Sequence, residues 1–539
     1  MKKALILVVL FSLCALAAEE KFSKRIVSAL DRAAVAALTP ETQPKKAKYV
    51  FYFIGDGMGV NVVQIAKDYL RVQDKNAKLN LEAFPVMGAA LTYCADKFVT
   101  DSSASGTALA SGYKTNYGVA GITPEMEAVD SVAVFAKKRG MKVGIVSTVT
   151  CLEATPGAFF AHQGWRGRYY PSIFDLVDSE FDYFAGGDIW DKHGKDVKLT
   201  NWQDATNILA RGVVSCTVNA EGKPEIVWRN SEEIIQENGY KYVTTQEEFE
   251  NLKPGCGKVY VSHPDRGWCF PLRVDKNEAP FLGDYVKKGI ELLDNDKGFF
   301  MMVEGSMIDL GSHSNDGPYM LGEFFDFDNA IGVALDFYRQ HPDETLIVVT
   351  ADHETGALTL GHVGHHPEFA KYAKCTFGSF RNKVKEYKSK LAECRENHSN
   401  ELSGNFDEIL PLLEEWYGVS KKGDKVSFHK DEWEKLQKAF EDEINPEYDK
   451  KSDYAKYNYK GSENPFVYTF QKLFNNRCGI EYHTGGHSSA PSPIFAIGVD
   501  SAPLGGLIEN TAIPVAIAKA IDKDGEFPTK PYKKPILQY

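Results

Sequence analysis

Five short apolar runs, spread along a chain of 539 residues, most constrain how this protein can fold. Each run is only four to six residues long and is continuously apolar. Runs of this kind are typical of strands that are covered on both faces in a parallel sheet. They are Tyr49–Ile54, Val143–Ser147, Phe299–Val303, Leu346–Thr350 and Ile494–Ile497.

Helical patterns lie between these runs. Residues 130–139 begin at Asp130, whose carboxylate can cap a helix, and end in a basic turn before Gly140. Residues 329–340 carry apolar side chains at helical spacing on one face. Because strands alternate with helices along the chain, the sequence predicts an α/β fold. Its expected core is a doubly wound, mostly parallel central sheet with helices on both faces.

Polar side chains follow four of the runs, at the points where the strands are expected to end. In chain order they are Asp56, Glu153 with Thr155, Glu304, and Asp352 with His353. Ligands of doubly wound folds bind beyond the carboxyl ends of the parallel strands. We therefore expect these side chains to meet in one shared cleft.

The composition changes between His362 and Cys478. Residues 381–395, 407–416 and 431–440 form charged amphipathic patterns of helical period, joined by polar segments. We interpret residues 18–539 as a single α/β domain that carries a helical insertion at about 362–480.

The first residues have the features of an export signal. Met1-Lys2-Lys3 is basic, Ala4 to Leu16 is an apolar run too short to span a bilayer, and Ala15-Leu16-Ala17 offers a cleavage site. We interpret residues 1–17 as a signal peptide and expect the mature protein in the periplasm or outside the cell. Since no later run has the length of a membrane span, stable membrane insertion is not expected.

Of the nine cysteines, Cys14 leaves with the signal, and an exported chain can pair the others. Cys256 with Cys269, and Cys375 with Cys394, are local candidate pairs, and buried free thiols are the alternative. None of the cysteines has CxxC spacing, which argues against a cysteine-based zinc site.

The charge balance excludes one class of function. The chain has 62 Lys and Arg against 74 Asp and Glu, a formal net charge of −12. A protein built to bind nucleic acid needs a clustered positive footprint, so no such role is expected. An enzyme that acts on phosphate can still be acidic overall when metal ions supply the local positive charge.

The segment Val99–Ala108 places small hydroxyl residues, Ser102 among them, at an expected helix start. Backbone N–H groups at a helix N-terminus favour an anion, so a phosphoryl group held there would be stabilised. A serine hydroxyl becomes a strong nucleophile once a base or a metal lowers its pKa. Taken alone, the segment is better explained as a serine-rich helix cap.

Further segments carry residue types that bind metals. Asp309 and His313 lie four positions apart after the third run, so they can share one face of a helical turn and bind one ion. A histidine, His487 or His483, also precedes the last run, and the spacing favours His487. Oxygen and imidazole ligands suit zinc, while all-oxygen sets suit magnesium.

Together these segments resemble the motifs of the alkaline phosphatases, in the same order and over nearly the whole mature chain. The matching segments are Phe53–Gly59, Thr100–Thr107, Ala154–Pro156, Ala161–Arg166, Val303–His313, Thr350–His353 and Gly486-His487. The resemblance implies two zinc sites and one magnesium site. It assigns Asp309, His313 and His487 to the first zinc, Asp56, Asp352 and His353 to the second, and Asp56, Thr155 and Glu304 to magnesium.

The resemblance also implies a reaction. Ser102 attacks phosphorus to form a phosphoserine, and Arg166 clamps two phosphate oxygens with its planar fork. Water activated at the first zinc then releases the phosphate. Asp101 is expected to orient Arg166 by an ion pair, with a helix-capping carboxylate as the alternative.

Two positions depart from the family's pattern. Glu153 stands where many bacterial relatives carry Asp and animal relatives carry His, so its longer carboxylate is expected near a water on the third metal. Leu310 stands where relatives often carry Lys or His, which removes a polar contact to phosphate.

We expect an exported phosphomonoester hydrolase of broad substrate range that works best at alkaline pH and, by the resemblance, as a homodimer. The alternatives are a phosphodiesterase or nucleotide pyrophosphatase of the same superfamily, and a non-catalytic metal- or phosphate-binding protein. Arg166 and the third-metal residues favour monoesters, because a diester offers fewer anionic oxygens. A non-catalytic protein would not need Ser102.

Overall fold

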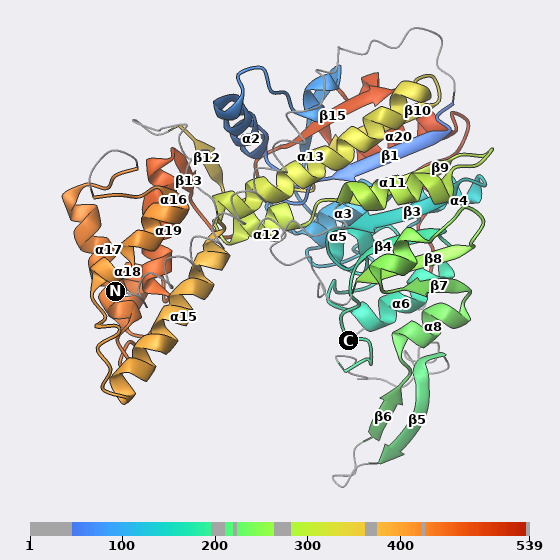
Figure 1. Cartoon of the computed structure of the whole chain (residues 1–539). Helices are drawn as coiled ribbons and strands as arrows, with labels where there is room; N and C mark the ends of the chain where they lie inside the picture. The colour runs from blue at the N-terminus through green and yellow to red at the C-terminus, as the bar shows by residue number, and fades with distance from the viewer. Residues whose placement is uncertain are drawn as a thin grey trace.

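The computed structural model describes residues 46–195, 211–218, 224–263, 282–361, 375–421 and 426–534. Its centre is a ten-stranded sheet with the strand order β16-β2-β15-β10-β1-β9-β3-β4-β8-β7 (Figure 1). These strands are β1 (Tyr49–Ile54), β2 (Val86–Leu91), β3 (Lys142–Ser147), β4 (Tyr183–Gly187), β7 (Tyr240–Val243), β8 (Lys258–His263), β9 (Phe299–Glu304), β10 (Thr345–Thr350), β15 (Ser492–Gly498) and β16 (Gly506–Glu509). Two-stranded ladders join β5 (Val213–Val218) to β6 (Pro224–Trp228), β11 (Glu354–Thr355) to β14 (His487–Ser488), and β12 (Leu358–Leu360) to β13 (Ile480–Tyr482).

Helices cover both faces of the sheet and also form a lobe beside it (Figure 1). Around the sheet lie α2 (Val60–Gln73), η1 (Asn80–Ala83), α3 (Ser102–Ser111), α4 (Val132–Lys138), α5 (Ala154–Gly157), α6 (Tyr169–Asp178), α8 (Ser231–Glu237), α9 (Gln246–Glu250), α11 (Leu282–Leu293), α12 (Met307–His313), α13 (Gly317–Gln340), η4 (Ala502–Leu504) and α20 (Ala512–Ile521). The helical lobe, the described residues between 375 and 478, contains α15 (Phe377–Glu396), η3 (Phe406–Glu408), α16 (Leu410–Tyr417), α17 (Lys430–Glu443), α18 (Asp453–Tyr459) and α19 (Pro465–Arg477).

Strand β1 lies near the middle of the sheet, and its six residues are all buried. Tyr49, Phe51 and Phe53 point into one apolar core with side chains of α2, α11 and α13. The intervening residues point into a second core with side chains of α4, α6 and α20. Because alternate residues of a strand face opposite sides, a continuously apolar run is what a strand covered on both faces requires. The predicted doubly wound, mostly parallel sheet is confirmed.

One predicted strand runs in an unexpected direction. β1 is parallel to both β9 and β10, but β15 is antiparallel to β10 and to β2. The interpretation of the run at 494–497 as a parallel strand is therefore wrong, because an apolar run records burial and not direction. As a consequence, the residues that precede β15 lie at the same edge of the sheet as those that follow β10.

Two helices begin at other residues than predicted. The helix expected from Asp130 is capped instead by Ser131, whose hydroxyl accepts from Val134 N at 3.1 Å, while Asp130 pairs with Lys138. The helix expected at 329–340 begins at Gly317, after the capping residue Asp316. Its first half is buried on nearly all sides, so it shows no amphipathic period for the sequence to reveal.

The helical lobe is held together by aromatic side chains. The rings of Phe377, Phe380, Tyr417, Phe470 and Phe474 contact one another with centroid separations of 5.0–6.0 Å. They belong to the same apolar cluster as the core on one face of the sheet. The lobe is thus joined to the rest of the protein by a continuous apolar core and not by the chain connections alone. The three predicted helices are present, and α18 and α19 were not predicted.

The cysteine and export predictions are tested only in part. Cys394 is a buried free thiol, so the predicted pair with Cys375 is wrong. Cys269 and the predicted signal peptide at 1–17 lie outside the described residues. Among the helices of the described ranges, none combines the length and the apolar composition needed to cross a membrane.

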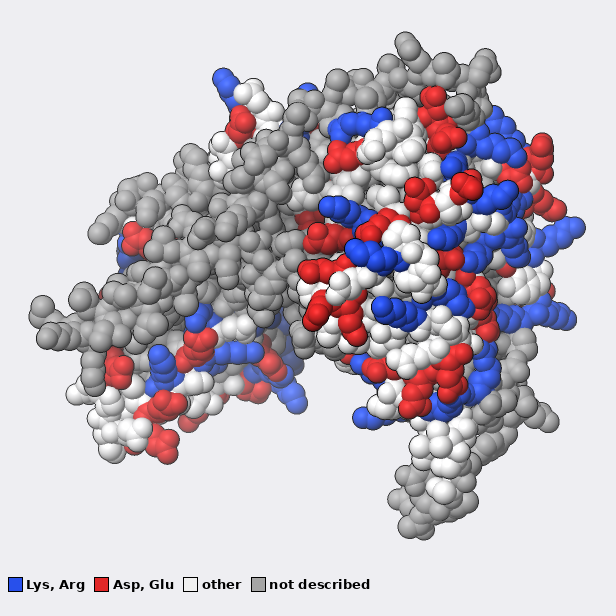
Figure 2. Space-filling view, turned by 45° about the vertical axis from the view of Figure 1, so that its right-hand side comes forward, with Lys and Arg blue, Asp and Glu red and all other residues white. Residues whose placement is uncertain are grey.

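Charges of both signs share the visible surface. On the face shown in Figure 2, Lys and Arg side chains are interspersed with Asp and Glu over the part of the molecule that contains the sheet. Among the described residues of this face, neither sign forms a large patch of its own.

The junction between β15 and β10 offers a test of the fold. Gly498 has φ +101°, and a Cβ there would lie 2.0 Å from the carbonyl oxygen of Thr345, whereas Gly506 has φ +83° with open space around it. Gly506→Ala adds only backbone strain, about 1 kcal/mol. We expect Gly498→Ala to lower the free energy of unfolding by about 3 kcal/mol or more, because backbone atoms must also move. Denaturant unfolding of both variants measures this, and equal losses would contradict the strand pairing.

Candidate active site

The first group of polar side chains lies at the carboxyl edge of β1 and β10. Asp56 follows β1, and Asp352 and His353 follow β10, which is the neighbour of β1 in the sheet. His353 Nε2 lies 3.5 Å from Asp56 Oδ1 and 3.2 Å from Asp352 Oδ2. All three side chains are almost completely buried. Their ligand atoms converge closely enough to surround one metal ion.

Ser102 stands beside this group at the first turn of α3. Asp101 caps the helix by accepting from the backbone N–H groups of Ser103 and Ala104. The capping geometry points Ser102 Oγ toward His353, with 3.1 Å between Oγ and Nε2. The predicted helix start is confirmed, and a phosphoryl group on Ser102 would lie at the positive end of a ten-residue helix.

A second group contains Asp309, His313 and His487. Asp309 and His313 lie one turn apart on α12, with His313 Nε2 3.0 Å from Asp309 Oδ2. His487 arrives from far along the chain because β14 pairs with β11, which places it opposite Thr355. His487 Nε2 lies 3.2 Å from His313 Nε2. These three residues again converge at metal-binding distance.

Hydrogen bonds orient all three imidazoles. The Nδ1 atoms of His313 and His487 lie 2.6 Å and 2.8 Å from the backbone carbonyls of Gly485 and Thr100, so each Nδ1 carries the proton that it donates. The Thr355 hydroxyl donates to Asp309, and its oxygen therefore accepts from His353 Nδ1 at 3.2 Å. Each Nε2 is left with a free lone pair that points into the site, which is how metal-binding histidines are held.

The two groups are direct neighbours. The rings of His353 and His487 are stacked with centroids 3.6 Å apart, and the Thr355 hydroxyl touches both Asp309 and His353. The two groups of side chains therefore meet at one place, at the edge of the sheet where the sequence predicted such a meeting.

A third set of oxygen atoms lies beside the first group. The Thr155 hydroxyl is 3.4 Å from Asp56 Oδ2, and Glu304, the last residue of β9, accepts a hydrogen bond from Ser147. Glu153 caps α5 by accepting from Ala154 N at 2.8 Å and also accepts from the Tyr169 hydroxyl at 2.9 Å. This set offers oxygen atoms only, the donor type that magnesium prefers.

Burial of so many acids strongly shifts their pKa values. Burial, followed by repulsion from Asp352, raises the pKa of Asp56 well above its usual range, and Asp56 Oδ1 has no hydrogen-bond partner within the described chain. Burial also raises the pKa of Glu304 to about 8. In their ionised forms such carboxylates repel one another in a dry environment, and a multivalent cation relieves that repulsion. The donor set and its electrostatics therefore fit bound metal ions.

Arg166 faces the nucleophile. Its Nη1 lies 3.2 Å from Asp101 Oδ2 and 3.4 Å from Ser102 Oγ, and its Nη2 lies 3.8 Å from Glu153 Oε2. Burial works to lower the pKa of Arg166, but the charges of Glu153 and Asp101 more than offset this and raise it. Asp101 thus makes both the predicted ion pair and the alternative helix cap.

Some site residues lie apart from these groups and others were not foreseen. His483 is exposed and contacts Thr359, so it lies outside the metal groups, whereas His487 lies within one. Leu310 packs against the small apolar cluster that contains Met307. Thr355, Ser147 and Tyr169 orient site residues, and no spacing rule could reveal them, because each acts through one contact formed only in the folded chain.

Comparison with known proteins agrees with this geometry. The profile of the family described as alkaline phosphatase matches residues 47–523. The chain is 28% identical to alkaline phosphatase 3 of Bacillus subtilis over 483 residues, 88% of this chain and 89% of that protein. It is 30% identical to the alkaline phosphatase of Escherichia coli over 350 residues, 59% of this chain and 72% of that protein. The crystal structure of a cold-active alkaline phosphatase from a psychrophilic Shewanella has a similar fold, with a TM-score of 0.66 at 23% identity, covering 88% of this chain and 99% of that one.

The buried carboxyl groups predict how the metal-free protein responds to pH. Burial, followed by repulsion from Asp309, raises the pKa of Asp352 to about 7, above an unfolded value of about 3.9. Between these values the folded chain binds the extra proton, so stability is lost as pH rises from about 4 to about 7. We expect the urea midpoint of the chelated protein to be lower at pH 8 than at pH 5. In Asp352→Asn the loss of unfolding free energy over this interval should be smaller by roughly 1 kcal/mol or more, because the amide has no proton to release.

Asp453→Asn is the matched control, because this acid on α18 is fully exposed and its loss should leave the pH response unchanged. An equal response in wild type and Asp352→Asn would show that Asp352 ionises as easily in the folded chain as in the unfolded one.

Proposed function

This chain belongs to the alkaline phosphatase family, and we propose that it hydrolyses phosphate monoesters through a phosphoserine formed on Ser102. The proposal is carried by the position of Ser102 Oγ, which lies within 3.4 Å of Arg166 Nη1 and 3.1 Å of His353 Nε2. The nucleophile, the phosphate clamp and a metal group thus meet at one atom.

Three ions would account for the three ligand sets. We assign one zinc to Asp309, His313 and His487, and a second to Asp56, Asp352 and His353, because mixed oxygen and imidazole donors suit zinc. We assign magnesium to Asp56, Thr155 and Glu304, whose donors are all oxygen. When bound, these cations supply positive charge that favours ionised oxygens at the attacking and departing positions.

The first chemical step transfers the phosphoryl group to the protein. Ser102 Oγ attacks phosphorus, the Oγ–P bond forms, and the bond from phosphorus to the leaving alcohol oxygen breaks. Ser102 Oγ gives up one proton and the departing alkoxide takes up one, so the alcohol leaves in its neutral form. The N-terminus of α3 then faces the phosphoryl oxygens.

The second step releases the product. Water attacks phosphorus, the Oγ–P bond breaks, and a proton from water returns to Ser102 as inorganic phosphate leaves. Because Ser102 returns to its first state, the site is ready for another ester.

Arg166 positions the phosphoryl group in both steps. A guanidinium presents two parallel N–H donors to two phosphate oxygens. Asp101 holds one nitrogen at 3.2 Å, and Glu153 lies 3.8 Å from the other, which limits the orientations that Arg166 can adopt. Glu153 is in turn held by Tyr169, which supports a role for Glu153 at the rim of the magnesium set.

The proposals on export, domain organisation and oligomeric state rest on the sequence and on its similarity to the family. We propose export by a signal peptide at 1–17, a single domain at 18–539 with a helical insertion at about 362–480, and action as a homodimer of broad substrate range at alkaline pH. N-terminal sequencing of the secreted protein tests the cleavage, and its mass in solution tests the dimer.

Removing the nucleophile tests the proposal directly. We expect Ser102→Ala to lower kcat for p-nitrophenyl phosphate by at least about 10³-fold, because no other hydroxyl takes its place. Ser103→Ala is the matched control, since the adjacent Ser103 hydroxyl is buried without a hydrogen-bond partner in the described chain. It should retain most of the activity. Full turnover in Ser102→Ala, or no labelled phosphoserine in wild type quenched at mildly acidic pH, would refute the mechanism.

The ion assignment predicts the metal content. The purified protein should hold two zinc ions and one magnesium per chain, and chelation should remove activity and lower the midpoint of thermal unfolding. Glu304→Gln weakens only the all-oxygen set, so we expect it to keep both zinc ions and lose magnesium, as measured by elemental analysis. Loss of zinc along with magnesium in Glu304→Gln would contradict the division into three sites.

A further inference from the structure

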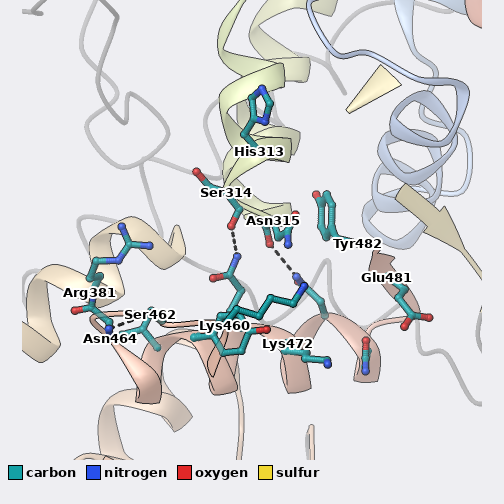
Figure 3. A pocket seen from close by; sticks show the side chains of 15 residues that line it. His313, Ser314, Asn315, Arg381, Lys460, Ser462, Asn464, Lys472, Glu481 and Tyr482 are labelled. Carbon is teal, nitrogen blue, oxygen red and sulfur yellow. Dashed lines mark hydrogen bonds between the residues drawn. The ribbon is translucent and has the colours of Figure 1, made fainter. Parts of the chain in front are cut away.

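A second cleft lies between the end of α12 and the helical lobe (Figure 3). Its volume is about 270 Å³. One wall is the turn at Ser314 and Asn315, and the others are side chains of α15, α19 and the segment after α18. The phosphoryl-transfer chemistry at Ser102 uses none of the side chains that the lobe contributes.

The side chains that line this cleft carry more positive than negative charge, although the chain as a whole is acidic. Arg381, Lys460 and Lys472 reach it from three different elements, and Glu481 is the acidic residue among the lining residues. Amide side chains such as Asn464 add hydrogen-bond donors to the wall. Such a set of donors attracts an anion.

Among the described residues, the three cations lack a partner that would neutralise them. No hydrogen bond or ion pair joins the side chain of any of the three to another described residue, and Arg381 Nε is buried without an acceptor. Glu443 interacts electrostatically with Arg381, but its carboxylate is already hydrogen-bonded by Lys388 at 2.8 Å and by Phe466 N at 3.3 Å. A buried donor without an acceptor is unfavourable, and a bound anion would satisfy it.

This cleft is separate from the site of phosphoryl transfer. His313 lines it through its backbone side, and its imidazole points away from Arg381 and Lys460 in Figure 3. That imidazole is engaged by Asp309 and Gly485 instead. The two sites nevertheless share a wall, because Gln471 and Asn475 of α19 donate to the backbone carbonyls of Ser314 and Asn315.

We propose that this cleft is a second anion site that binds a phosphate group. Arg381 supplies a planar fork suited to phosphate oxygens, and Lys460 and Lys472 supply point charges. The volume fits inorganic phosphate or the phosphate group of a small organic phosphate, and it approaches the lower limit of ordinary ligand pockets. Binding here is independent of the reaction at Ser102.

Counting phosphate sites tests the proposal. Equilibrium dialysis of the metal-loaded protein with labelled inorganic phosphate should give two sites per chain. The Arg381→Ala, Lys472→Ala double variant should keep the first site and bind at least tenfold more weakly at the second. Lys472→Glu, a change at an exposed position that folding tolerates, should give the same loss. Propylphosphonate, which resists hydrolysis, replaces phosphate in a second series, and tighter binding at the second site identifies an organic phosphate as the ligand.

The Lys435→Ala, Lys456→Ala double variant is the matched control, because it removes two exposed cations of the lobe outside the cleft. It should keep both sites. A single site in wild type, or a second site that persists in the Arg381 and Lys472 variants, overturns the proposal. Neither result depends on whether Ser102 is the nucleophile.

Discussion

The mutual repulsion of buried ligand atoms is the constraint on which the rest of the structure depends. Carboxylates of Asp56, Asp352 and Glu304 and the free lone pairs of three imidazoles point into one water-poor space at the edge of the sheet. Without positive charge this arrangement is unfavourable. The fold maintains it because hydrogen bonds from other residues orient the three imidazoles, as Thr355 orients His353.

The sheet explains how distant residues reach this space. Parallel strands β1, β9 and β10 all end at the same edge and deliver Asp56, Glu304 and Asp352 there. The antiparallel β15 begins where they end, and the β11–β14 ladder then places His487 beside His353. Had β15 run parallel to its neighbours, the residues before it would lie at the opposite edge.

The helical lobe supplies none of the proposed metal ligands, but it contacts the backbone next to one of them. Two amides of α19 hold the backbone immediately after His313, where Asn315 adopts a left-handed conformation with φ +53°. The backbone that carries a metal ligand is therefore fixed from the side away from the metal. A ligand in the cationic cleft would touch the same turn. The short segment from His313 to Asn315 therefore connects the proposed phosphate site of the lobe with the proposed metal site.

The sequence by itself determined which residues are buried in strands and which residue types follow them. Strands β1, β3, β9 and β10 and the α12 pair of Asp309 and His313 were predicted, because period and spacing are local properties of the chain. Only the tertiary structure decided the direction of β15 and the roles of Thr355 and Tyr169. Each of these depends on a pairing between segments far apart in the chain, and no local pattern records the partner that a segment meets on folding.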